Sequence, residues 1–280
     1  MQDSNITKKK SWPIVVGVLV FVLAIGLAAA FAWYYYAIML PAQLAKQEEV
    51  TINHMQAIAR AMLAYYDTHD HFPPAFTPDA KRRPLTSWRV SLLPFLEEEA
   101  LAQQYDDQQP WDSPANRKHA ETTPKPFQGP LADCLPGQTP FCVVVGPDTM
   151  FTGNKIKGQL VPTFYDPYTN KPQPPVRLQG TQYEDCLDGT VNTLLFYADL
   201  EHPVTWSEPT DVSPETFIAR YSKQDLQQKR LYVAFVSGDV VRITKIDPQN
   251  ILNLLNRHDG ESVEYEKIDL QEDPLAIPTN

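Results

Sequence analysis

A stretch of thirty residues from Trp12 to Pro41 contains no charged side chain, and it follows three lysines at positions 8–10. It is longer than the roughly 20 apolar residues that a helix needs to cross a bilayer. It also includes an aromatic cluster at 33–36, of the kind that lies at a membrane–water boundary. No basic residue follows it until Lys46. This charge asymmetry predicts a single-pass anchor in the inner (cytoplasmic) membrane, with residues 1–11 in the cytoplasm and the rest of the chain outside.

A cleaved signal peptide is the alternative for this segment. Small residues at Ala28-Ala29-Ala30 or Ala30-Phe31-Ala32 offer a cleavage site of the A-x-A kind. The apolar character, however, continues for about ten residues beyond that site, whereas the apolar region of a signal peptide is about 7–15 residues long. The length therefore favours a retained transmembrane helix at 12–41.

Composition limits the partners and the redox chemistry of the chain. The net charge of −10 gives an acidic surface that repels phosphate, so we expect no nucleic-acid partner. No cofactor motif is evident. Three cysteines, Cys134, Cys142 and Cys186, could form one disulfide outside the cytoplasm. Cys134 and Cys142 would close a short loop, or either could pair with Cys186, and the sequence does not choose between these pairings.

The region after the anchor begins with a predicted helix over 44–67. Its apolar residues recur at spacings of three and four, which gives one apolar stripe. The helix must end before Pro73, because a proline disfavours helical geometry at the residue ahead of it.

The middle of the chain is rich in proline, with 26 prolines in the whole sequence. We expect short elements joined by loops: two helical pieces between Ser91 and Tyr105, separated at Pro94, and a helix capped by Ser113 that begins at Pro114. The apolar run at 141–146 predicts a buried strand.

The C-terminal part predicts a sheet. Residues 193–198, 230–236 and 240–246 are rich in aromatic and branched side chains, and the turn at 237–239 joins the last two as a hairpin. Asp247 should cap a helix that ends at Gly260.

Together these elements predict an α+β fold. The amphipathic helix can bury its apolar stripe only against one face of the antiparallel sheet, and it continues the transmembrane helix, as in pilin-like subunits. The predicted extracytoplasmic domain covers 42–265, followed by an acidic tail at 266–280.

Four polar residues at the predicted helix exit, Asp67, His69, Asp70 and His71, could bind a divalent metal. The same residue types are common at helix ends and turns, and no second ligand cluster accompanies them. We therefore predict a structural helix exit and no metal site.

The segment from Asp188 to Thr193 is the strongest local motif. Asp188 and Gly189 favour a tight turn, and Asn192 and Thr193 can bond to neighbouring backbone. Such a loop could also present its polar groups to a ligand. The structural turn is the favoured interpretation.

Two tryptophan dipeptides, Trp88-Arg89 and Trp111-Asp112, would suit a platform on which carbohydrate stacks. Tryptophans more often fill a core, and Arg89 could pair with Asp112. The sequence contains no catalytic motif of the serine-hydrolase, zinc-protease or phosphate-loop type, so we expect no enzymatic activity.

Six segments of the chain form a jointly recognisable set: MQAIARAMLAYYDTHDHFPPA (55–75), SWRVSLLPFLEE (87–98), YDDQQPWDSPANRK (105–118), DGTVNTLLFYAD (188–199), VTWSEPTD (204–211) and YVAFVSGDVVRI (232–243). In these segments the chain resembles the planctomycete-type family of pseudopilin-like proteins (the DUF1559 family), some of which are labelled solute-binding or PulG-like. The motif residues that this resemblance marks as structural or ligand-binding are Trp88, Arg89, Trp111, Asp112, Asp188, Gly189, Asn192, Thr193 and Gly238.

The chain departs from the family pattern at both ends. Members usually begin with a type IV prepilin leader, which is lacking ahead of this apolar run. Their C-terminal signature is a histidine nine residues before Asp-Gly, whereas this chain has Gln227 at that offset and Ser237-Gly238 at the turn.

The resemblance and the anchor together imply a non-catalytic, extracytoplasmic protein of the cell envelope that acts through protein–protein interaction and is linked to a type II secretion or pilus-like system. The alternative that the resemblance offers is an extracytoplasmic solute-binding protein. An unrecognised hydrolase is the third hypothesis.

Overall fold

The computed structural model describes residues 12–79, 83–152, 180–222, 230–261, 263–264 and 269–271. The chain forms two compact units, Met1–Lys46 and Gln47–Asn280, which are described separately. The predicted cytoplasmic tail at 1–11 and Gln227 lie outside the described residues, as does most of the predicted acidic tail.

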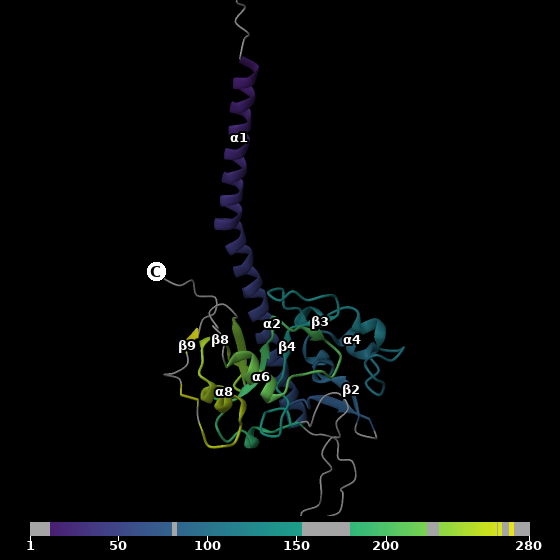
Figure 1. Cartoon of the computed structure of the whole chain (residues 1–280). Helices are drawn as coiled ribbons and strands as arrows, with labels where there is room; N and C mark the ends of the chain where they lie inside the picture. Colours follow the sequence, from purple (N-terminus) through teal and green to yellow (C-terminus); the bar gives the residue numbers. More distant parts are fainter. Residues whose placement is uncertain are drawn as a thin grey trace, which may run out of the picture. The chain divides into compact units, whose positions relative to one another are not determined.

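The first unit is helical throughout its described length (Figure 1). Helix α1 (Trp12–Tyr34) leads into one π-helical turn, η1 (Tyr35–Met39), and then into the first turns of α2 (Leu40–His69). Its large apolar side chains are exposed, from Val15 to Met39. Among the described residues, one helix is long and apolar enough to cross a membrane.

The second unit begins with the amphipathic part of α2. The sequence predicted a helix over 44–67, and the structure confirms it. Asp70 then adopts a left-handed conformation, with φ of 61°, and two prolines follow at 73 and 74. The buried residues of α2 recur at helical spacing: Thr51, Ile52, Met55, Ile58, Ala59, Ala61, Met62 and Tyr65.

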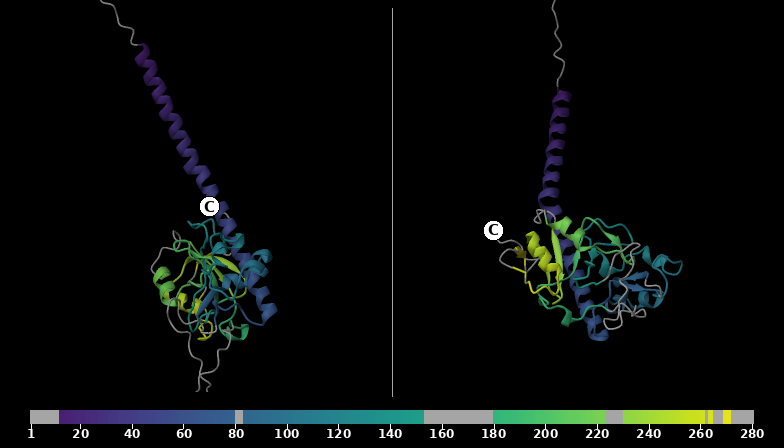
Figure 2. Two further views of the ribbon diagram at one scale, coloured as in Figure 1. Left: turned by 90° about the vertical axis from the view of Figure 1, so that its right-hand side faces the viewer. Right: turned by 60° about the horizontal axis from the view of Figure 1, so that its bottom comes forward.

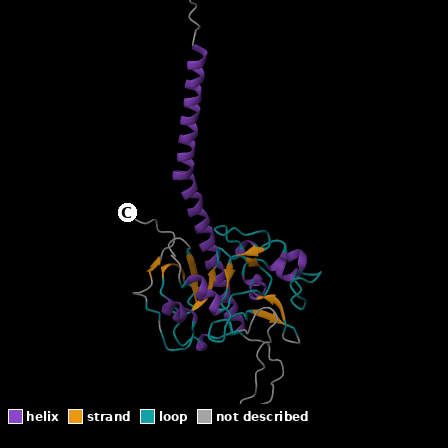
Figure 3. Ribbon diagram, viewed as in Figure 1, coloured by secondary structure: helices purple, strands orange, loops and turns teal. Residues whose placement is uncertain are grey.

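A five-stranded antiparallel sheet forms the centre of this unit (Figure 3). Its strands, in spatial order, are β4 (Phe141–Cys142), β5 (Leu194–Ala198), β7 (Leu231–Phe235), β8 (Val240–Lys245) and β9 (Asp269–Gln271). Strands β7 and β8 form the predicted hairpin. Gly238 in the turn of this hairpin has a φ of 94°, a backbone conformation that residues with a Cβ rarely adopt. A Cβ at this position would also lie 3.0 Å from the Leu63 side chain of α2.

The two faces of the sheet bury different apolar clusters. Side chains of β7 alternate: Tyr232 and Ala234 pack with α2, whereas Leu231 and Val233 pack on the opposite side. On that opposite side lie α6 (Pro214–Tyr221) and α8 (Pro248–Leu255). The views of Figure 2 show α2 and these two short helices around the sheet. The unit is therefore α+β, with the pilin-like packing of a long helix on an antiparallel sheet.

Helix α8 begins as predicted and ends earlier than predicted. The Asp247 carboxylate accepts hydrogen bonds from the backbone N–H groups of Gln249 and Asn250, at 2.9 and 3.1 Å. The last helical residue is Leu255, because Asn256 is extended, with a ψ of 143°. Gly260 lies in the following loop with a φ of 82°. Its left-handed conformation serves that loop and not the helix end.

The proline-rich middle contains many short elements. Two helical pieces lie between Ser91 and Tyr105, as predicted: η2 (Leu93–Phe95) and α4 (Glu99–Gln104), which follow α3 (Trp88–Ser91). The predicted break at Pro94 is wrong, because Pro94 lies inside η2 and residues 96–98 separate the two pieces. The helix predicted from Pro114 is wrong in its start: Ser113 closes a turn, and α5 begins at Arg117. The run at 141–146 is buried, but only its first two residues form a strand. The elements are β1 (Phe76–Pro78), β2 (Pro84–Ser87), α3 (Trp88–Ser91), η2 (Leu93–Phe95), α4 (Glu99–Gln104), α5 (Arg117–Ala120), η3 (Lys125–Phe127), β3 (Gln138–Thr139), η4 (Tyr183–Asp185) and β6 (Val204–Thr205).

Candidate functional site

The predicted dipeptide Trp88-Arg89 opens helix α3, directly after strand β2. Ser87 is in an extended conformation, and its hydroxyl accepts the backbone N–H of Arg89, which caps the helix. Both side chains are fully buried. Trp88 packs edge-on against Phe127, with ring centroids 6.1 Å apart. A tryptophan without exposed surface cannot serve as a stacking platform, so Trp88 is a core residue.

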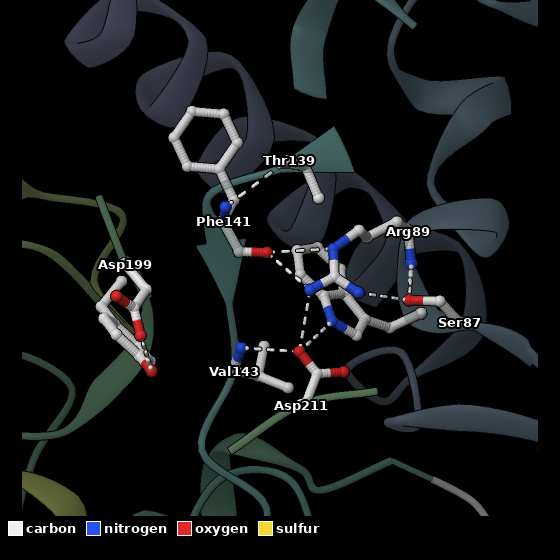
Figure 4. A network of polar contacts seen from close by, with 9 residues as sticks. Ser87, Arg89, Thr139, Phe141, Val143, Asp199 and Asp211 are labelled. Carbon is white, nitrogen blue, oxygen red and sulfur yellow. Dashed lines mark hydrogen bonds and ion pairs between the residues drawn. The ribbon is translucent and has the colours of Figure 1, made fainter. Parts of the chain in front are cut away.

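The Arg89 guanidinium is held by four hydrogen bonds (Figure 4). Its Nε and Nη2 donate to the carbonyl of Phe141 at 3.0 and 2.6 Å, and Nη1 donates to the Ser87 hydroxyl at 2.7 Å. Nη2 also donates to Asp211 Oδ1 at 2.8 Å, and the Asp211 side chain is only 2% exposed. Arg89 therefore connects three segments that are distant in sequence.

The predicted pairing of Arg89 with Asp112 is wrong. Asp112 is exposed, and its carbonyl accepts a hydrogen bond from Arg117. A guanidinium without access to water requires a carboxylate that is equally buried, and Asp211 supplies it. Trp111 is partly buried and reaches the same region through its backbone, because its N–H donates to the carbonyl of Leu85.

Asp211 serves as the acceptor at the centre of this network. Its Oδ1 also accepts the Val143 N–H at 3.0 Å and the Trp88 indole N–H at 3.3 Å. Burial raises the pKa of Asp211 above its ordinary value, and the Arg89 charge and these donors act in the opposite direction. The charged groups of this network are buried, so its role is to fix segments 84–91, 141–143 and 211.

A second buried carboxylate, Asp199, lies at the end of β5. Its side chain is 1% exposed, and it accepts hydrogen bonds from Arg220 and from His202 Nδ1, the latter at 3.0 Å. The Arg220 side chain is 26% exposed and that of His202 is 50% exposed, so these two contacts connect the end of β5 to α6 and to the surface. Figure 4 shows that Asp199 does not take part in the hydrogen bonds around Arg89.

The segment that Arg89 fixes forms one wall of a cavity of about 460 Å³. Thr86 of β2 and Val90 of α3 lie on this wall, and Tyr65 of α2, Phe95 of η2 and Tyr105 after α4 lie on the others. The Tyr65 and Phe95 rings meet edge to face, with centroids 5.7 Å apart. Tyr65 also stacks on His69, at 4.0 Å between ring centroids. The cavity thus has aromatic side chains on several walls, and polar and apolar residues both line it.

Buried hydroxyl groups lie at this cavity. Thr86 is 0% exposed and Tyr105 is 7% exposed, and neither hydroxyl has a hydrogen-bond partner among the described residues. Ser207 does not line the cavity; its carbonyl accepts the Ser87 N–H, and its hydroxyl lies close to Tyr105. Burial raises the pKa of Tyr105 to about 12, with the nearby Ser207 hydroxyl acting in the opposite direction. A buried polar group left without a partner costs about 1–3 kcal/mol, so the Thr86 and Tyr105 hydroxyls at the cavity call for an explanation.

The turn from Asp188 to Thr193 satisfies its polar groups internally. Gly189 has a φ of 94°, and its carbonyl accepts the Thr193 hydroxyl at 3.1 Å. The Asn192 amide donates to the carbonyl of Asp188 at 2.8 Å. The Asp188 carboxylate accepts the backbone N–H groups of Asp259 and Gly260. This geometry is that of a structural turn that holds the loop after α8.

The polar residues at the exit of α2 are also engaged with the backbone. His69 Nδ1 lies 2.9 Å from the carbonyl of Tyr65, and His71 Nδ1 lies 2.7 Å from that of Phe72. Within the described part of the chain, no group of three or more His, Cys, Asp or Glu side chains is placed to hold a metal ion.

The three cysteines are free thiols, so none of the three disulfide pairings considered from the sequence is formed. Cys142 and Cys186 are buried in the two different apolar clusters, and Cys134 is partly exposed. Burial raises the pKa of the Cys134 thiol to about 11. At neutral pH it is therefore protonated and a poor nucleophile.

Sequence reasoning missed Asp211 and the cavity hydroxyls. Asp211 stands at the end of the segment 204–211 that carries the family resemblance, which is a signal that could have identified it. Tyr105 and Ser207 stand in the segments 105–118 and 204–211 that carry the family resemblance, whereas Thr86 stands in none of these segments. No local pattern marks their hydroxyls as members of one site.

The fold and these sites define a class: an α+β, pilin-like domain that follows one candidate membrane-spanning helix. The particular family is shown by comparison. The family model described as "Protein of unknown function (DUF1559)", with the short name SBP_bac_10, matches residues 51–263, and the chain therefore belongs to this family. No curated protein and no solved structure is significantly similar to it.

Proposed function

We propose that this protein is a non-catalytic component of the cell envelope, anchored by α1 in the inner membrane, that acts outside the cytoplasm through protein–protein interaction. The exposed apolar side chains between Val15 and Met39 carry this proposal, because water does not favour so long an unbroken apolar surface. The lysines at 8–10 support a cytoplasmic N-terminus. The pilin-like packing supports a link to a pilus-like or type II secretion assembly.

A groove along α2 supports the interaction role. It has a volume of about 550 Å³ and is lined by Ala57, Ala61 and Ala64, with Arg60 and Lys125 on its rim. Glu97 and Glu98 stand on the same rim, so charges of both signs surround a narrow apolar floor. Polar rims around an apolar centre are characteristic of protein interfaces. Glu97 has a φ of 59°, an uncommon conformation for a side-chain-bearing residue.

The anchor and the partner can be tested in native membranes. The intact mass of the extracted protein should be that of the full chain, 31.7 kDa, and protease added to intact spheroplasts should digest the part after Pro41. A photo-crosslinking residue at position 60 should capture an envelope protein, whereas the same residue at the exposed Lys118 of α5 should not. Equal capture at both positions, or a product shortened by about thirty residues, would contradict the proposal.

Solute binding outside the cytoplasm is a second candidate function. The observation that favours it is the aromatic cavity with its buried hydroxyls, because small-molecule sites are concave, mostly apolar and carry a few polar groups. A thermal-shift screen should then find a small molecule that raises the midpoint of unfolding.

A further inference from the structure

We propose that the cavity between α2, β2 and α4 binds a neutral, hydroxyl-rich small molecule of the saccharide class. This inference rests on the second candidate function, solute binding, and is independent of the anchor and of the groove along α2.

The size and walls of the cavity suit such a ligand. Its volume of about 460 Å³ lies within the range of about 300–1,000 Å³ found for small-molecule sites. Tyr65 and Phe95 supply aromatic surface on two walls. A saccharide ring has an apolar face of C–H groups that packs against aromatic rings, and hydroxyl groups at its edge that need polar partners. The cavity offers both kinds of surface.

The unpartnered hydroxyls match the edge of a saccharide ring. Thr86 and Tyr105 both line the cavity, are more than nine-tenths buried, and have hydroxyls without a partner in the described parts of the chain. Each of these hydroxyls can donate one hydrogen bond and accept others, as each sugar hydroxyl can. Sugar hydroxyls would satisfy groups that the fold itself leaves unpaired.

The charges around the cavity favour a neutral ligand. Its described lining contains one carboxylate, Asp107, and one imidazole, His69, and no lysine or arginine. Both of these residues are exposed and therefore stand at the rim. A phosphate or carboxylate on the ligand would enter a cavity whose described lining has no lysine or arginine to pair with it, which is unfavourable. A neutral saccharide avoids this cost, and Asp107 can accept hydrogen bonds from its outer hydroxyls.

Binding can be measured by calorimetric titration of the full-length protein in detergent. The probes are maltose, cellobiose and N,N′-diacetylchitobiose, with glucose 6-phosphate as the charged comparison. At least one neutral disaccharide should bind with a Kd of about 1 mM or tighter, and glucose 6-phosphate should bind more weakly. If none of the three binds in this range, or if glucose 6-phosphate is preferred, the saccharide proposal is overturned.

Two variants test whether the cavity hydroxyls bind a ligand or belong only to the protein core. Tyr105→Phe and Thr86→Val each remove one hydroxyl and keep the volume, so the unfolding midpoint should stay equal or rise. Each should weaken disaccharide binding about tenfold, the loss of one hydrogen bond. Tyr221→Phe is the matched control, because Tyr221 is buried in the other apolar cluster and should leave binding unchanged. Unchanged affinity in both cavity variants would show that these hydroxyls take no part in binding.

The outcomes also distinguish this inference from solute binding in general. If a charged or apolar ligand from the thermal-shift screen loses affinity in Tyr105→Phe, the cavity is a solute site and the saccharide class is wrong. If no ligand of any class responds to the cavity variants, both the inference and the second candidate function fail, and the interaction role is untouched.

Discussion

Replacing Arg89 by methionine tests the buried network directly. The substitution removes four side-chain hydrogen bonds and leaves the Asp211 carboxylate without its cation. Breaking a buried ion pair by removing one partner costs about 3–5 kcal/mol. For a domain of this size, each kcal/mol lowers the unfolding midpoint by about 2–4 °C, so the expected loss is about 6–20 °C. Methionine fills most of the arginine volume, which keeps the cavity contribution small.

The loss of stability in Arg89→Met should depend on pH, and the pKa shift of Asp211 determines the direction of this dependence. Burial raises the pKa of Asp211, so the folded protein binds this proton more tightly than the unfolded chain does. The contribution of Asp211 to stability is therefore greatest below its unfolded pKa, about 3.9, and is lost as the pH rises through its higher folded pKa. Without Arg89 the folded pKa rises further, and the difference between variant and wild type should grow from acidic to neutral pH.

Urea unfolding of both proteins across this pH range is the assay. Arg117→Met is the matched control, because Arg117 is exposed and donates only to the carbonyl of Asp112 at 3.2 Å; its effect should stay within about 0.5 kcal/mol. If Arg89→Met costs less than about 1 kcal/mol at neutral pH, Arg89 does not depend on Asp211 as argued. A penalty that is equal at acidic and neutral pH would refute the linkage.

Three further predictions concern local features. Gly238→Ala should lower the free energy of unfolding by about 1–2 kcal/mol in thermal unfolding, because Gly238 combines a positive φ with a close approach to Leu63. Gly260→Ala should lower it by less, because Gly260 has a positive φ but open space around it. Asp247→Ala should cost about 1 kcal/mol in urea unfolding, as expected for a helix cap, and an unchanged midpoint would show that the cap is dispensable. In alkali, the stability that Tyr105 contributes is present below its unfolded pKa of about 10 and is lost as the pH rises through its folded pKa of about 12. Tyr105→Phe should therefore lose less stability than the wild type over this pH interval. Identical alkaline unfolding profiles of the two proteins would contradict this.

The elements that the sequence predicted correctly are those with local signals. Helix α2 shows its apolar stripe within 30 residues, and the β7–β8 hairpin shows two apolar strands and a glycine turn within fifteen. The cap of α8 needs only Asp247 and the two residues after Pro248. Each of these features is decided by contacts between residues that are close in the chain, and such contacts leave a readable pattern.

The candidate sites depend on contacts between distant residues, and for this reason the sequence did not reveal them. Arg89 and Asp211 are separated by 122 positions. Asp112, the partner expected from the sequence, is exposed, whereas the Asp211 side chain is buried. The cavity is assembled from α2, β2, α3, η2 and α4, none of which carries a recognisable binding motif. Burial decides the role of each of these polar residues, and burial is a property of the whole fold.

The buried network and the cavity are connected through one short segment. Most strands in this region have only two to four residues, so the backbone ladder supplies few hydrogen bonds. Arg89 compensates by fixing Ser87 and Phe141 through its side chain. Thr86 and Val90 flank Ser87 and Arg89 and line the cavity. The ion pair is therefore best understood as the support that holds the cavity wall in place, and its loss should loosen the cavity before it unfolds the sheet.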